Sequence, residues 1–128
     1  MDQTLIQLRQ RMVETSTEFL KAQRAYLKAA TLDSRKSETE LKDAAEEYRK
    51  ATELYDATLQ EFHQYLLAAE PSEMIAEELK HIEQFIAALE KVKWASSMLI
   101  EHHMELIDQD IKLTSQPSPK VDETPKDS

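Results

Sequence analysis

The 128-residue chain contains no glycine and no cysteine, and three of its four prolines fall in the last dozen residues. Tight hairpin turns and phosphate-binding loops need glycine, because glycine adopts positive φ at little cost. Its absence therefore counts against β-rich folds and against glycine-rich nucleotide-binding loops. Without cysteine the chain can form no disulfide and no thiolate zinc site, and it has no thiol nucleophile.

Long apolar runs and basic stretches are also missing. No apolar run approaches the roughly 18 residues that a membrane span requires, and the first residues lack the basic and apolar regions of a secretory signal. The chain carries 25 acidic and 16 basic residues, for a net charge of −9. This charge opposes binding to nucleic acid or to an anionic membrane surface. The sequence therefore predicts a cytoplasmic protein with no membrane span and no nucleic-acid partner.

Apolar residues instead recur at intervals of seven. A seven-residue repeat places its members on one side of a helix that packs against other helices. The first such helix is predicted over residues 3–31, and its stripe is wide enough to contact two neighbours. Its rows are Leu5, Met12, Phe19 and Tyr26; Ile6, Val13, Leu20 and Leu27; and Leu8, Thr15, Ala22 and Ala29.

Two further helices are predicted over residues 38–69 and from Pro71 or Ser72 to Leu113. Pro71 marks the boundary between them, because proline interrupts a helix interior but is accepted in a first turn. The core row of the second helix is predicted to be Leu41, Tyr48, Tyr55 and Phe62. The core row of the third is predicted to be Phe85, Val92, Leu99, Leu106 and Leu113, supported among others by Ile75, Ile82 and Leu89.

The connection between the first two helices has two interpretations. Residues 31–40 are short of apolar side chains, and Ser37 with Glu40 has the pattern of a capping box at a helix start, which predicts a turn. The apolar row nevertheless stays in phase from Leu27 through Ser34 to Leu41. A single continuous helix over residues 3–69 therefore stays open as the alternative.

These patterns predict an all-α fold. Residues 1–113 are expected to form one domain, an antiparallel bundle of three long helices with coiled-coil-like heptad packing. Residues 114–128 are polar and proline-dotted, so they are expected to form a disordered tail. The third helix is predicted to extend about ten residues past the others. That end carries Leu106, Ile107, Ile111 and Leu113, so it is expected to dimerise or to face a partner, unless the connecting loop covers it.

Metal and catalytic chemistry have weak support. Glu78 and His81 have the spacing used by di-iron bundles, with His63 nearby across a turn, but such a site needs a second motif of the same kind. The adjacent His102 and His103 diverge by about 100° on a helix. No nucleophile–base pattern is present, so we predict no enzymatic activity and no cofactor or metal.

Trp94 is the residue most typical of a binding function. It shares its heptad position with charged residues, and Met98 lies one turn further on; exposed tryptophan is typical of interface hot spots. The alternative is that Trp94 packs on the first helix or on the tail. The predicted interface residues are Trp94, Met98, Leu106, Ile107, Ile111 and Leu113.

The sequence therefore predicts a non-enzymatic protein–protein interaction module, an adaptor or a partner-specific chaperone. Its partner is another protein or a second copy of the chain, in a homodimer or a hetero-complex. One alternative is a structural subunit of a larger assembly, which a continuous first helix would favour. The other is a metal-binding bundle that uses Glu78, His81 and His63.

Overall fold

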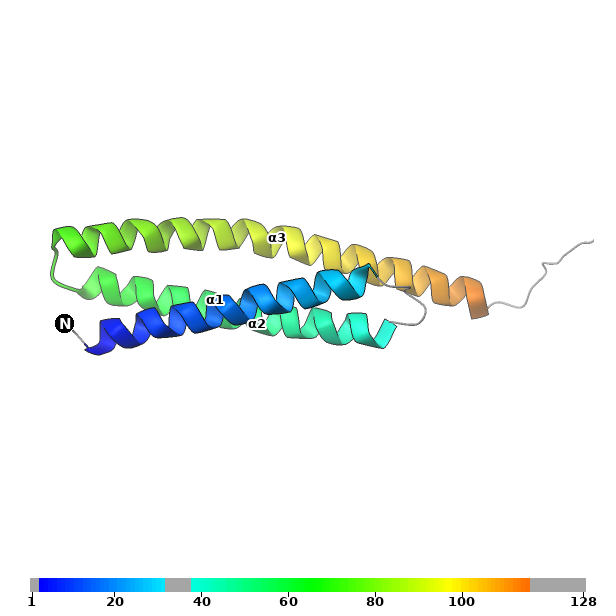
Figure 1. The fold of residues 1–128 in the computed structure, drawn as a ribbon. Helices are drawn as coiled ribbons and strands as arrows, with labels where there is room; N and C mark the ends of the chain where they lie inside the picture. The colour runs from blue at the N-terminus through cyan, green and yellow to red at the C-terminus, as the bar shows by residue number, and fades with distance from the viewer. Residues whose placement is uncertain (1–2, 32–37, 116–128) are drawn as a thin grey trace, which may run out of the picture.

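The structure is a computed structural model that describes residues 3–31 and 38–115, with side chains described through residue 109. It consists of three helices, α1 (Gln3–Ala30), α2 (Glu38–Ala68) and α3 (Glu73–Ser115), and the described residues contain no strand. The predicted all-α fold of three long helices is therefore confirmed. Successive helices run in opposite directions (Figure 1), which is compatible with the expected antiparallel bundle.

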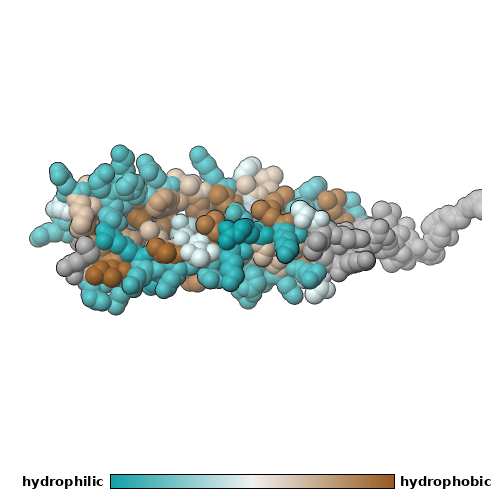
Figure 2. All heavy atoms as spheres, in the orientation of Figure 1, coloured by the Kyte–Doolittle hydropathy of each residue, from teal (hydrophilic) through white to brown (hydrophobic). Residues whose placement is uncertain are grey.

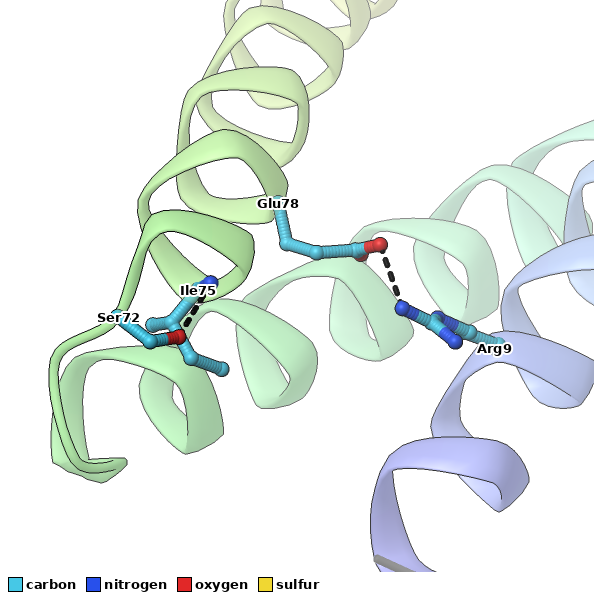
Figure 3. A network of polar contacts seen from close by, with 4 residues as sticks. All are labelled: Arg9, Ser72, Ile75 and Glu78. Carbon is cyan, nitrogen blue, oxygen red and sulfur yellow. Dashed lines mark hydrogen bonds and ion pairs between the residues drawn. The ribbon is translucent and has the colours of Figure 1, made fainter. Parts of the chain in front are cut away.

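The boundary between α2 and α3 lies where Pro71 predicts it. The backbone N–H of Ile75 donates to the Ser72 hydroxyl oxygen at 3.1 Å (Figure 3). The N–H of Ala76 donates to the Ser72 carbonyl at 2.9 Å. Ser72 thus caps α3 and accepts hydrogen bonds from backbone donors that a helix start leaves without partners.

The connection between α1 and α2 separates two helices that pack against each other. The alternative of one continuous helix over residues 3–69 is therefore wrong. At the end of α1, the N–H and the hydroxyl of Thr31 both donate to the Lys28 carbonyl, at 3.2 and 2.8 Å. The predicted capping box depends on Ser37, which lies outside the described residues, as does most of the predicted tail, residues 116–128.

The core is centred on α2, which packs along both other helices, whereas α1 and α3 approach each other less closely. Aromatic rings join α1 to α2: the ring of Phe19 lies 5.8 Å from that of Tyr48 and 5.4 Å from that of Tyr55. The predicted α2 row is buried at Leu41, Tyr48 and Phe62 and half-buried at Tyr55. The aromatic row of α2 therefore forms the core that the sequence predicts.

Two rows that the sequence assigns to the core are largely exposed instead. They are Val13, Leu20 and Leu27 in α1, and Phe85, Leu99 and Leu106 in α3, where Val92 is half-buried. The buried residues of α3 are Ile75, Ile82, Leu89, Ile100 and Ile107. The physical reason is that α1 and α3 each direct their buried side towards α2. The apolar rows that border the space between α1 and α3 are therefore not covered by a helix among the described residues.

Candidate protein-binding surface

Trp94 lies on the side of α3 that faces away from α2, and 69% of its surface is exposed. Lys93, the preceding residue, donates to Asp56 of α2 at 2.9 Å. Because successive helical residues diverge by about 100°, this ion pair helps to hold Trp94 turned outward. The hydrogen bond to Asp56 raises the pKa of Lys93, so its ammonium stays charged. Met98, one turn beyond Trp94, is exposed beside it.

The C-terminal part of α3 differs from the predicted interface. The helix is 43 residues long, against 28 for α1 and 31 for α2, and its end runs past both of them (Figure 1). Leu106 is exposed, but Ile107 is only 3% exposed. Ile107 lies seven residues after Ile100 and is buried in the core with it. The prediction that Ile107 belongs to an exposed interface is therefore wrong. The side chains of Ile111 and Leu113 lie outside the described part of the chain.

Polar contacts also bridge α1 and α3 directly. Near the start of both helices, Arg9 donates to Glu78 at 2.7 Å (Figure 3). Further along, the Tyr26 hydroxyl lies 2.5 Å from Nδ1 of His103. Burial raises the pKa of Tyr26 to about 12 and lowers the pKa of His103. At neutral pH the Tyr26 hydroxyl therefore donates to an unprotonated His103 nitrogen.

The His103 contact predicts a pH dependence of folding. Because the pKa of His103 is lower in the folded chain than in the unfolded one, the unfolded chain binds more protons as the pH falls below about 6.5. Stability is therefore present above that pH and decreases as the pH falls towards the folded pKa. His103→Asn keeps an acceptor for Tyr26 but cannot titrate. We expect urea unfolding to give a weaker loss of stability between pH 7.5 and 5.5 in this variant; an identical loss in both proteins would contradict the role of His103.

The metal-site candidates engage other partners. Glu78 forms the ion pair with Arg9, and Nε2 of His63 lies 3.1 Å from a carboxylate oxygen of Glu83. Within the described residues, no group of three or more histidine or acidic side chains is arranged to hold a metal ion. Glu78, His81 and His63 are therefore not brought together into such a group.

The sequence analysis missed a second apolar surface, a groove between α1 and α3. It is lined by Gln23 and Leu27 of α1, Tyr48 of α2, and Val92, Ala95, Ser96 and Leu99 of α3. The signal was present, because Leu27, Val92 and Leu99 belong to predicted heptad rows. Heptad spacing does not say whether the helix that covers a row belongs to the same chain, so these residues were assigned to the core.

Comparison with known protein families, with curated proteins and with solved structures finds no match to this chain. Among the described residues, no helix is both long enough and apolar enough to cross a membrane. A functional interpretation therefore depends on the surfaces of the bundle themselves.

Proposed function

We propose that this chain is a non-enzymatic protein-interaction module that binds another protein through the exposed surface of α3 around Trp94 and Met98. The observation that carries the proposal is the 69% exposure of the chain's one tryptophan. Covering the exposed part of this residue contributes roughly 3–4 kcal/mol at the usual coefficient for apolar burial, before the entropic costs of association are subtracted. Tryptophan is also the residue type most enriched at interface hot spots.

The arrangement around Trp94 supports a docking role, because the side chain is mounted on a regular helix. The Lys93–Asp56 ion pair links this part of α3 to α2, so little backbone order has to be gained on binding. The proposal includes no catalytic step. The described groups with shifted pKa values, such as Lys93 and Tyr26, are engaged in ion pairs or buried contacts that already account for the shifts.

A structural subunit that assembles with copies of itself is the second candidate. The extension of α3 past the other two helices favours it, because that end can be covered by a second copy (Figure 1). However, one continuous helix over residues 3–69 would have favoured this hypothesis, and α1 and α2 are separate helices. We therefore place it second.

The test is the double variant Trp94→Ala, Met98→Ala. Because both side chains are exposed, we expect the free energy of unfolding to change by less than about 0.5 kcal/mol. We expect affinity capture from lysate of the source organism, followed by mass spectrometry, to recover a stoichiometric protein with the wild type and at least about tenfold less with the variant.

The matched control is Leu54→Ala, Leu67→Ala, which truncates two exposed leucines of α2. It should recover the same protein as the wild type. Enrichment of the chain alone would contradict the adaptor proposal and favour self-assembly. A large loss of stability in the Trp94 variant would show that the side chain packs within the bundle.

A further inference from the structure

The groove between α1 and α3 has the geometry of an empty position in a four-helix bundle. In such a bundle each helix packs against two neighbours and lies diagonally opposite the third. Here α2 packs against α1 and α3, which approach each other less closely. Three positions of the bundle are thus filled, and the position opposite α2 is vacant within the described residues.

The walls of the groove carry apolar residues at the spacing that a helix requires. The groove is lined by Leu27 of α1 and by Val92 and Leu99 of α3. Their heptad rows continue along the two helices through Val13 and Leu20 on α1 and through Phe85 and Leu106 on α3, at intervals of seven residues. Most of these side chains are exposed, and hydrophobic atoms gather between α3 and α1 in Figure 2. At 1.5 Å per residue the two rows are about 21 and 31 Å long, which matches a helix of about 15–21 residues.

The described chain and its remaining sequence contain no suitable occupant. Residues 116–128 hold one aliphatic side chain, Val121, and three prolines. A segment of this composition has no apolar row with which to cover the walls, and its prolines oppose a helix. Residues 116–128 are therefore unsuited to fill the groove.

The charges beside the groove indicate which helix that is. The positions next to the apolar rows on their outer sides are Gln10, Thr17 and Arg24 on α1, and His81, Ala88, Ala95 and His102 on α3. One position further out lie Glu14, Lys21 and Lys28 on α1, and Gln84, Lys91 and Met98 on α3. These flanks hold four cations, Lys21, Arg24, Lys28 and Lys91, and one acidic residue, Glu14, in a chain of net charge −9, and all of these side chains are exposed. Among the residues that the structure describes, neither Arg24 nor Lys91 forms an ion pair.

Flanking charges select the partner of a packed helix, so these cations favour a helix with acidic flanks. A second copy docked groove to groove would instead set this surface against itself, with cation facing cation. Charge complementarity thus favours an acidic-flanked partner helix over groove-to-groove pairing of two copies.

We propose that the α1–α3 groove binds one amphipathic helix of another protein, which has apolar residues in a heptad row and aspartate or glutamate beside them. The bound helix takes the fourth position and covers Val13, Leu20 and Leu27 together with Phe85, Leu99 and Leu106. This inference rests on the proposed function as a protein-interaction module, and its groove borders the Trp94 surface, because Met98 lies at the edge of both.

The experiment uses a displayed library of 21-residue peptides. Each peptide has Leu or Ile at the two core positions of every heptad, and Glu, Lys, Gln or Ala at random beside them. Selection on the full chain is expected to enrich peptides with acidic flanks. We expect the double variant Leu20→Glu, Leu99→Glu to bind them at least about tenfold more weakly, because it places two carboxylates on opposite walls of the groove.

Two further variants make the test specific. Leu54→Glu, Leu67→Glu adds the same charge at exposed leucines of α2 and should bind the selected peptides as the wild type does. Arg24→Glu, Lys91→Glu should weaken acidic-flanked peptides and strengthen their lysine-flanked counterparts. Circular dichroism and urea unfolding verify that every variant is folded.

Two results would overturn the proposal. One is a selection in which no enriched peptide loses affinity for the Leu20→Glu, Leu99→Glu variant. The other is a wild-type dimer in analytical ultracentrifugation that becomes a monomer in this variant, which would assign the groove to a second copy. Either result leaves the proposed function of the Trp94 surface unaffected, provided that affinity capture still recovers the protein found in the test of that function.

Discussion

Replacing Phe62 with alanine is expected to lower the free energy of unfolding by about 3–5 kcal/mol. The Phe62 side chain is fully buried in α2, the helix that packs on both others. Its removal loses apolar burial and leaves a cavity that the surrounding helices can close only in part. Because a domain of this size has a stability of about 5–15 kcal/mol, the variant should unfold at a much lower urea concentration when followed by circular dichroism.

Leu67→Ala is the control, because Leu67 lies five residues further along α2 and is exposed. It should lower stability by less than about 1 kcal/mol. Equal losses in the two variants would contradict the orientation of α2 in the bundle, since that orientation alone makes one side chain a core residue and the other a surface residue.

The number of helices and the firmest boundary were predictable because their signals are local. Pro71 cannot continue a helix interior, and Ser72 accepts the hydrogen bonds of the next helix start whatever that helix packs against. The seven-residue repeats likewise determine which side chains share a face. The outward position of Trp94 also followed from its repeat, because that position otherwise holds residues such as Lys80 and Glu101.

The direction in which each face points was not predictable, because it depends on where the neighbouring helices lie. Phe85 and Ile82 are both large and apolar and lie within one turn of each other, yet only Ile82 faces α2. The same cause explains Ile107, which was expected at an exposed end but joins the core in the row of Ile100. The α1–α3 groove was missed for a related reason, since it exists only when two exposed rows on different helices border the same space.

Ile82→Ala and Phe85→Ala together test which side of α3 is buried. Ile82 is 1% exposed and Phe85 is 44% exposed. We expect Ile82→Ala to lower the free energy of unfolding by about 2–5 kcal/mol and Phe85→Ala to lower it by less than about 1 kcal/mol, although phenylalanine loses more atoms. Urea unfolding of both variants at one protein concentration gives the comparison.

A reversed order, with the larger loss in Phe85→Ala, would contradict the isolated three-helix arrangement. Repeating the measurement over a hundredfold range of protein concentration then identifies the cause. A loss that grows with concentration means that Phe85 is covered by a second copy, because association stabilises the folded state by mass action. A loss that stays constant means that α3 is rotated so that the Phe85 row faces α2. The expected order leaves the Phe85 row open to the partner helix that we propose for the groove.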